Sequence, residues 1–175
     1  MVKLCLVLLI ISLVATATWA NRVASPKHKT NLIHLQFYFH DRVTGNDITA
    51  VRVVSSPLKN SATFFGNITI SDDPLTEGPD PNSKLVGRAQ GLYASVGRDT
   101  LCLFNAYSFY MTNGIYNGSS FNVFGRNPTP NKVREVSIVG GTGAFRGARG
   151  FAILNTYYVS ATIAVVGYNV TISLD

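Results

Sequence analysis

The chain has 175 residues, of which 46% are hydrophobic and 14% are charged, and its net charge is +6 at pH 7. This length allows one domain with a substantial core but not two comfortable ones. The basic residues are scattered, and their one cluster is Lys27-His28-Lys29. Because no basic stripe carries interleaved aromatic residues, we expect no nucleic-acid partner.

The first twenty residues have the pattern of a secretory signal peptide. Lys3 precedes an apolar run over Leu4–Val14, and small residues that suit a cleavage site follow. The run is too short to span a bilayer well, and no later segment is a candidate for a membrane span. We therefore predict a signal peptide over 1–20, a flexible arm over 21–31, and one secreted domain over 32–175 with no membrane partner.

After the arm, the chain alternates between strand and turn patterns. Thr, Val, Ile, Phe and Tyr dominate, and no stretch has a convincing apolar period of 3.6 residues. About eight main strands are predicted: Leu32–Asp41, Ala50–Val54, Phe64–Ile70, Val86–Val96, Leu101–Tyr110, Ser120–Gly125, Val133–Val139 and Gly150–Leu174, the last broken near Ser160. Turn chemistry separates them, including Asp72-Asp73-Pro74 and Gly140-Gly141-Thr142-Gly143. This spacing indicates an all-β antiparallel sandwich or barrel.

The first strand carries an acid on its apolar face. Ile33, Leu35, Phe37 and Phe39 alternate with polar residues, and Asp41 continues the apolar row. A carboxylate at the end of such a row must pair, meet water or shift its pKa. Asp41 is therefore either a strand terminator that emerges into solvent or an acid at the mouth of an apolar cavity.

Two further strands place polar side chains on an inward face. Tyr93 follows a row of small residues, Gly87, Ala89 and Gly91, which either leave a hollow or allow strand curvature and close sheet contact. Arg134 shares its face with Val136 and Ile138, so it either snorkels or pairs with an inward acid such as Asp41. Asp41, Tyr93 and Arg134 form either a polar trio in a pocket or a buried ion pair that closes a barrel end.

Three sequons support export: Asn67-Ile-Thr69, Asn117-Gly-Ser119 and Asn169-Val-Thr171. By alternation we expect Asn67 and Asn169 to face outward, as a glycan requires. We predict glycosylation sites at Asn67, Asn117 and Asn169.

The common catalytic and cofactor motifs are not met. The Gly140–Gly143 run lacks the glycine spacing of a dinucleotide site, and no helix is predicted there. His34 and His40 point away from the Asp41 face by parity, and no ligands cluster at a metal spacing. Cys102 lies in an apolar run, so we expect a buried side chain. We therefore expect no metal and no cofactor.

Several segments, in matching order and spacing, resemble the plant dirigent proteins. They are Phe37-Tyr38-Phe39-His40-Asp41, Asp72-Asp73-Pro74-Leu75-Thr76, Val86-Gly87-Arg88-Ala89-Gln90-Gly91-Leu92-Tyr93, Tyr116-Asn117-Gly118-Ser119, the run from Arg134 to Gly143, and Ala148-Arg149-Gly150. The resemblance implies an eight-stranded antiparallel β-barrel that is secreted to the apoplast and assembles as a homo-oligomer, a dimer or a trimer.

The resemblance also implies a chemistry. Dirigent proteins bind phenoxy radicals of monolignols such as coniferyl alcohol, which a separate laccase or peroxidase makes, and direct their coupling to one enantiomer of a lignan. Some relatives instead dehydrate isoflavanols to pterocarpans through a quinone methide. The pocket residues of the family fall here on Asp41, Tyr93 and Arg134, which the resemblance makes the catalytic residues.

The chain departs from the pinoresinol-forming members in two ways. Asn127 stands where they carry an Asp, and an amide cannot donate a proton to a quinone methide, so we assign Asn127 to substrate binding. The cysteine pair that joins their two termini is also absent. These departures leave the product open.

Three functions therefore stay in consideration. The leading one is stereoselective control of phenolic radical coupling, in which catalysis is mostly positioning. The second is a dehydratase that needs no oxidase and loses activity in Asp41→Asn. The third is a barrel that only binds a hydrophobic ligand and does not depend on Asp41.

Overall fold

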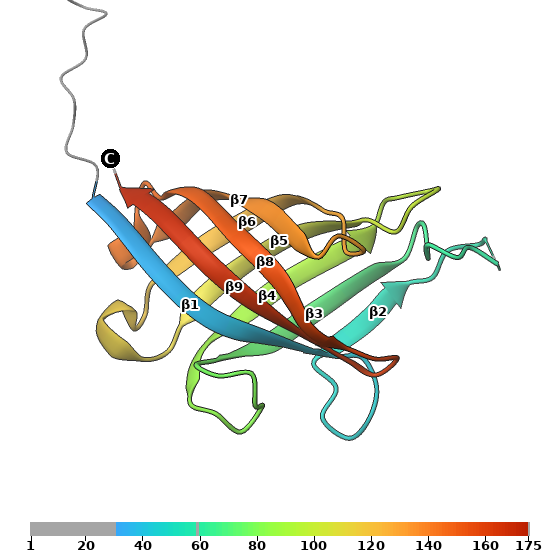
Figure 1. Cartoon of the computed structure of the whole chain (residues 1–175), viewed down its shortest axis with the longest axis horizontal. Helices are drawn as coiled ribbons and strands as arrows, with labels where there is room; N and C mark the ends of the chain where they lie inside the picture. Colours follow the sequence, from blue (N-terminus) through green and yellow to red (C-terminus); the bar gives the residue numbers. More distant parts are fainter. Residues whose placement is uncertain (1–30, 59, 175) are drawn as a thin grey trace, which may run out of the picture.

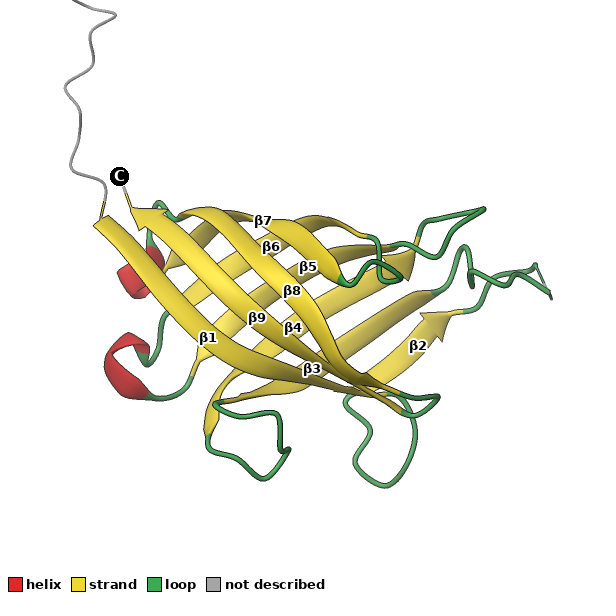
Figure 2. Cartoon of the chain, in the orientation of Figure 1, coloured by secondary structure: helices red, strands yellow, loops and turns green. Residues whose placement is uncertain are grey.

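The computed structural model describes residues 31–58 and 60–174, in which β-strands dominate (Figure 1, Figure 2). The strands are β1 (Asn31–Arg42), β2 (Ala50–Val54), β3 (Ile68–Thr76), β4 (Leu85–Ser95), β5 (Leu103–Met111), β6 (Ser120–Asn127), β7 (Val133–Thr142), β8 (Arg149–Val159) and β9 (Ile163–Leu174). Two short 3-10 turns, η1 (Gly114–Tyr116) and η2 (Gly143–Phe145), complete the regular elements. The predicted signal peptide and the predicted arm up to residue 30 lie outside the described residues, and none of the described helical turns is long and apolar enough to cross a membrane.

One strand pairing closes the sheet into a barrel. β1 pairs with β9 along its whole length, and the sheet then continues antiparallel from β8 back to β3. Closure comes from β1 against β3, where Tyr38 pairs with Thr76 and Phe39 with Leu75. The predicted eight-stranded antiparallel barrel is therefore confirmed, and β2 adds a further strand to the free part of β3 (Figure 1).

The prediction for β3 is wrong at both ends. The strand begins at Ile68 rather than Phe64, and it runs through Asp72-Asp73-Pro74, which was predicted as a turn. The proline is tolerated because β3 changes neighbours there. β2 pairs with β3 up to Ser71 and β1 only from Leu75, so the missing N–H of Pro74 lies between the two ladders.

Aromatic side chains fill one end of the barrel. The rings of Phe109 and Phe121 stack with centroids 5.1 Å apart, and those of Phe37 and Tyr168 stack at 5.5 Å. Phe145 follows from η2 and packs edge-on against Phe121. These five side chains are almost completely buried. A larger space remains toward the opposite end, which the ends of β1, β6 and β8 surround.

The small residues of β4 serve close strand contact rather than a hollow. A Cβ on Gly87 would lie 2.5 Å from the carbonyl oxygen of Tyr110, and one on Gly91 would lie 2.2 Å from that of Ala106. The backbones of β4 and β5 therefore approach too closely for side chains at these positions. Of the two interpretations of this row, close sheet contact is the one that the structure bears out.

Candidate functional site

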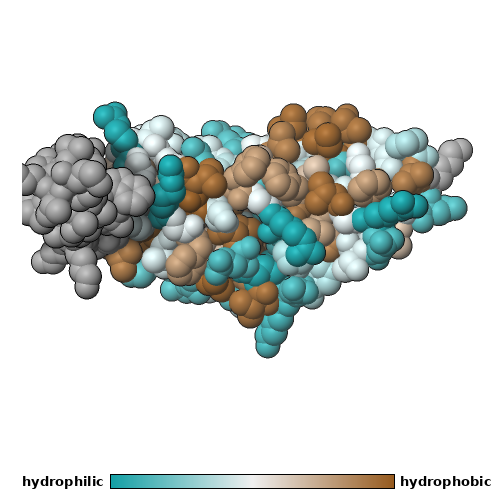
Figure 3. All heavy atoms as spheres, turned by 90° about the horizontal axis from the view of Figure 1, so that it is seen from above, coloured by the Kyte–Doolittle hydropathy of each residue, from teal (hydrophilic) through white to brown (hydrophobic). Residues whose placement is uncertain are grey.

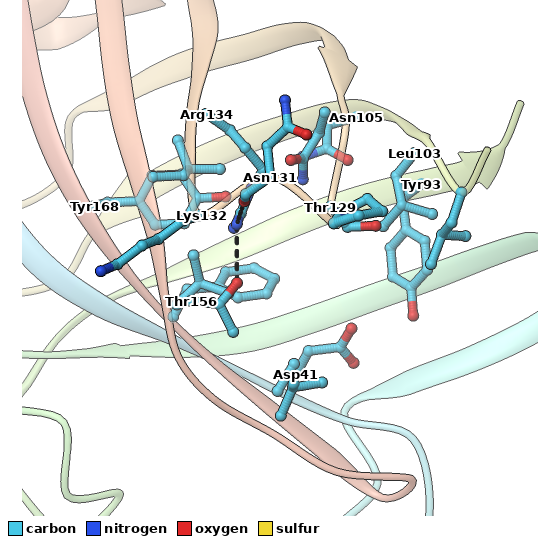
Figure 4. Close-up of a pocket in the computed structure, with 18 of the residues that line it drawn as sticks. Asp41, Tyr93, Leu103, Asn105, Thr129, Asn131, Lys132, Arg134, Thr156 and Tyr168 are labelled. Carbon is cyan, nitrogen blue, oxygen red and sulfur yellow. Dashed lines mark hydrogen bonds between the residues drawn. The ribbon is translucent and has the colours of Figure 1, made fainter. Parts of the chain in front are cut away.

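A cavity of about 550 Å³ occupies the open end of the barrel. Asp41, Tyr93, Asn127 and Arg134 all line it, although they come from four different strands. Figure 4 labels Asp41, Tyr93 and Arg134 in this cavity. The rest of its wall is largely apolar and aromatic: Phe39, Leu101, Leu103, Tyr107, Leu154, Val159, Ala164, Val166 and Tyr168. An apolar cavity with a few convergent polar groups is the usual form of a small-molecule site.

Asp41 lines this cavity, so of the two alternatives that the alternation of β1 left open, the acid at an apolar cavity is the one that the structure shows. Its neighbour on the same face, Phe39, also lines the cavity, while Arg42 turns outward to pair with Asp47. Burial raises the Asp41 pKa from the usual 3.8 to about 6, and the hydroxyl of Tyr93, which faces it, partly opposes this rise (Figure 4). The carboxyl therefore changes protonation state in mildly acidic solution.

Tyr93 and Arg134 keep their ordinary protonation states. Burial and the Asp41 charge raise the pKa of the Tyr93 phenol, so it remains a hydrogen-bond donor. Burial lowers the Arg134 pKa, and the nearby Tyr168 opposes this shift. The guanidinium stays charged because its ordinary pKa lies so far above neutrality.

Arg134 does not pair with Asp41. Its Nη1 donates to the carbonyl oxygen of Asn131 at 3.0 Å and to the Thr156 hydroxyl at 2.9 Å (Figure 4). Within residues 31–58 and 60–174 no carboxylate forms an ion pair with Arg134, although the side chain is only 4% exposed. The ion-pair alternative is therefore wrong, and the positive charge is available to a ligand.

Asp73 is a second buried acid that the sequence analysis missed, because it read this segment as a turn. Its side chain is fully buried, and its Oδ1 accepts a hydrogen bond from the Thr49 hydroxyl. Burial and then the Asp41 charge raise the Asp73 pKa to about 7, against the hydrogen bonds from Thr49 and Ser71. The signal was present in the alternation, since Thr69, Ser71 and Asp73 precede Leu75 on one face.

Two buried tyrosines, Tyr107 and Tyr168, lie between these acids and the aromatic core. The Tyr107 hydroxyl lies 2.9 Å from Ser71 Oγ, and burial followed by the Asp73 charge raises the Tyr107 pKa. Burial also raises the Tyr168 pKa, which the nearby Arg134 charge opposes. Both phenols therefore stay neutral and can orient a ligand by hydrogen bonding. Their signal was the same two-residue alternation in β5 and β9.

Several buried polar atoms of the cavity have no hydrogen-bond partner among the described residues. They are Asp41 Oδ1, Asn105 Oδ1, Asn127 Oδ1, Thr129 Oγ1 and Arg134 Nε. Unpaired buried polar atoms are costly to a fold unless something else satisfies them. Their concentration in one cavity favours a ligand that carries several oxygen or hydroxyl groups on an apolar frame.

The two histidines of β1 lie away from the cavity lining. His34 Nδ1 lies 3.2 Å from the Thr171 hydroxyl, and the fully buried His40 bonds Thr76 through Nε2 at 2.7 Å. In the described part of the chain, no three His, Cys, Asp or Glu side chains gather at a spacing that suits a metal ion. Cys102 is buried, as predicted.

The outward orientation predicted for Asn67 is wrong. Its side chain is buried, and its Oδ1 accepts a hydrogen bond from the Ser56 N–H at 2.8 Å. The polar row of β3 faces inward because this end of the barrel is a polar-lined hollow, while Ile70 faces solvent over β2. Asn117 and Asn169 are exposed, so glycosylation stays a prediction that fits these two positions.

The comparisons with known proteins agree with this geometry. The family model described as Dirigent-like protein matches residues 32–173. The chain is 51% identical to dirigent protein 1 of Arabidopsis thaliana over 79% of this chain and 77% of that one. It is 40% identical to pterocarpan synthase 1 of Glycine max over 97% of this chain and 95% of that one.

A solved structure of a pterocarpan synthase dirigent protein superposes on the barrel. Its TM-score is 0.78 at 40% identity, with 83% of this chain and 91% of that chain covered. The family model covers all of Asp41, Asp73, Tyr93, Asn127 and Arg134. The chain therefore belongs to the dirigent family.

Proposed function

We propose that the protein binds a phenolic alcohol in the barrel cavity and controls the formation and stereospecific reaction of its quinone methide. The observation that carries this proposal is the Asp41 carboxyl, whose pKa of about 6 lets it hold a proton in a largely apolar cavity. An acid tuned toward the working pH is the requirement for general acid catalysis.

The steps assign a role to each group. Protonated Asp41 donates to the departing hydroxyl, whose C–O bond breaks, and water leaves. The ring phenol of the substrate gives its proton to solvent as the quinone methide forms. Arg134, which no carboxylate neutralises among the described residues, stabilises the negative charge that develops on this ring oxygen. A second phenol of the substrate then adds to the quinone methide carbon and passes its proton to the Asp41 carboxylate, while the ring oxygen takes a proton back from solvent.

The balance of this reaction is the loss of one water molecule, so it needs no oxidant. Two relatives carry the name pterocarpan synthase, at 40% and 45% identity, which supports this route. Asn127 binds substrate without proton transfer, because an amide has no acidic proton in this pH range. Asp73 lies behind the cavity wall, and the Asp41 charge is one of the causes that raise its pKa, so the two carboxyls titrate as a coupled pair.

A second candidate is stereoselective coupling of two monolignol radicals that a separate laccase or peroxidase supplies. The size of the open end favours it. A hollow of about 530 Å³, with Asn67, Thr69 and Ser95 in its wall, shares Tyr93, Leu103 and Ala164 with the main cavity. Together the two hollows offer room for two phenolic units held in one orientation.

The test uses an isoflavanol-type phenolic alcohol without any oxidase, analysed by chiral chromatography. We expect conversion to the cyclised ether, and a loss of at least about 100-fold in Asp41→Asn, the range of a lost general acid. Asp99→Asn, which removes a charge from an exposed position, is the matched control and should keep full activity.

A second arm of the experiment uses coniferyl alcohol with a laccase, with and without the protein. An enantiomeric excess in this arm alone would favour the coupling candidate over dehydration. Binding of the phenols without any change of product in either arm, unaffected by Asp41→Asn, would reduce the protein to a ligand-binding barrel.

We further propose that the protein acts in the apoplast as a homo-oligomer. The outer face carries one cross-strand row formed by Leu92, Ala106, Phe124, Ser137 and Phe151 in β4 to β8. Leu92, Phe124 and Phe151 are each more than a third exposed, and hydrophobic patches interrupt the face that Figure 3 presents. Phe124→Glu should convert an oligomer to a monomer in light scattering, and a monomeric wild type would refute this assembly.

A further inference from the structure

A small groove on the outside of the barrel has no role in the chemistry proposed above. It lies over β1, β8 and β9, has a volume of about 190 Å³, and is lined by Gln36, Tyr38, Asn155, Thr156, Tyr157, Gly167, Tyr168 and Asn169. We infer that this groove holds the first sugar of an N-linked glycan on Asn169. The inference rests on the extracellular location proposed above.

The groove exists because a glycine interrupts the outer face of β9. Gly167 pairs with Tyr38 on β1 and with Asn155 on β8, so it lies between two outward side chains and forms the floor between them. A Cβ on Gly167 would meet the Tyr38 ring at 3.4 Å, an ordinary contact. The fold would therefore tolerate a side chain at position 167. Glycine at this position keeps the bottom of the groove open.

Aromatic rings form a wall of the groove. Tyr157 is 65% exposed, and its ring meets that of Tyr38 nearly at a right angle, with centroids 5.9 Å apart. A register shift between Thr156 and Tyr158 lifts Tyr157 out of the regular ladder. An exposed ring at such a position offers its apolar surface to a ligand at little conformational cost.

The chemistry of the walls suits a sugar. A pyranose has an apolar face of C–H groups, which an aromatic ring can cover, and a rim of hydroxyl groups. The side-chain amides of Gln36 and Asn155 can donate to and accept from that rim. Aromatic surface with a few amides is thus complementary to an N-acetylhexosamine.

Asn169 delivers that sugar to the groove. It is exposed, lies on the same face of β9 as Gly167, and follows it by two residues, which is about 7 Å along a strand. A tethered sugar has a high effective concentration, so a groove for one ring suffices to hold it. This tether, and the small size of the groove, favour the glycan of the chain itself over a free polysaccharide.

The experiment combines site occupancy with a double-mutant cycle on thermal stability. The full chain is secreted from plant cells, glycopeptides are analysed by mass spectrometry, and the glycans are trimmed to one N-acetylglucosamine. We expect Asn169 to be occupied and Asn169→Gln to lower Tm by about 4 °C. In a Tyr157→Ala background the same substitution should lower Tm by about 1 °C or less.

Matched controls separate the groove from general effects of glycosylation. Tyr158 is another exposed tyrosine of β8. In a Tyr158→Ala background, Asn169→Gln should still lower Tm by about 4 °C. Gly167→Ala places a methyl group on the floor of the groove, so it should reduce the Tm change that Asn169→Gln causes. Asn117→Gln should change Tm by the same amount with and without Tyr157. Equal effects of Asn169→Gln with and without Tyr157 would overturn the inference.

Two further outcomes decide against it in distinct ways. An unmodified Asn169 on secreted protein would overturn the glycan site while leaving the extracellular location intact, and retention of the full chain inside the cells would overturn both. Unglycosylated protein is also titrated with free chitobiose and followed by NMR, where we expect shifts only at millimolar concentration. Micromolar binding would overturn the assignment to the tethered glycan in favour of an external carbohydrate. None of these measurements depends on catalytic activity.

Discussion

Replacing Asp73 with asparagine should make the barrel more stable at neutral and alkaline pH. The carboxyl is fully buried in β3 and does not form an ion pair with any described residue, so its ionised form is disfavoured in the folded state. Asparagine has nearly the same shape and keeps an oxygen that can accept the hydrogen bond from Thr49. The substitution thus removes the ionisation and little else.

The size of the effect follows from proton linkage. The folded pKa of Asp73 is about 7 and the unfolded value is near 3.8, so the folded state binds the proton more tightly. The stabilisation from this proton is fully present below the unfolded pKa and is lost as the pH rises through the folded pKa. Between about pH 5 and about pH 8 the wild type should lose about 3 kcal/mol of unfolding free energy from this group.

Other buried groups also change protonation state between these pH values. Their contributions to the pH dependence of stability occur in both proteins and are compared by taking the difference from wild type. Burial lowers the His40 pKa, so its contribution to stability is lost as the pH falls below its unfolded pKa, the opposite trend. Asp41, whose pKa is about 6, loses stability with rising pH in the same direction as Asp73. Both groups are present in wild type and in Asp73→Asn, so the difference between the two proteins cancels His40 and reports Asp73 together with its coupling to the Asp41 charge.

Urea unfolding at about pH 5 and about pH 8 measures this difference. The stability of Asp73→Asn relative to wild type should increase by about 3 kcal/mol from the lower to the higher pH. Asp72→Asn is the control, because its half-exposed side chain pairs with Arg88 at the surface, and it should follow the pH trend of wild type. Parallel pH profiles of wild type and Asp73→Asn would refute the assignment of a raised pKa to this carboxyl.

Three further predictions follow from the cavity and the core. The rate of the proposed dehydration should fall as the pH rises above about 6, since that mechanism uses Asp41 in its protonated form. A pH–rate profile that is flat from about 5 to about 7, one unit on either side of the Asp41 pKa, would contradict this role. Phe109→Ala, a substitution of a fully buried ring, should cost about 3–5 kcal/mol in urea unfolding. Gly91→Ala should destabilise by about 1–3 kcal/mol because its Cβ would meet the Ala106 carbonyl, whereas Gly140→Ala, whose nearest atom lies 3.9 Å away, should change stability little.

The inward faces of β1 and β7 could be predicted because they depend on local alternation. In β1 and β7 a single period of two residues decides which side chains face inward, and buried neighbours such as Phe39 and Val136 identify that face. Asp41 and Arg134 therefore pointed into the barrel from the sequence alone. The family resemblance added the closed eight-stranded topology, which alternation had left open between a sandwich and a barrel.

The second acid and the true orientation of Asn67 depended on which strands become neighbours. Pro74 reads as a turn residue unless β3 changes its partner from β2 to β1 at that point, and this exchange exists only in the closed barrel. Polar Thr69 and Ser71 face inward only because one end of the barrel stays unfilled.

The sequence by itself thus determined most of the strands and the inward faces of β1 and β7, which place Asp41 and Arg134 on apolar rows. The tertiary structure decided that Arg134 and Asp41 do not pair, that Asp73 is buried where the Asp41 charge acts on it, and that Gly167 opens a groove between Tyr38 and Asn155. The physical reason is range: side-chain alternation is a property of neighbouring residues, while burial and pairing depend on strands that closure brings together from distant parts of the chain.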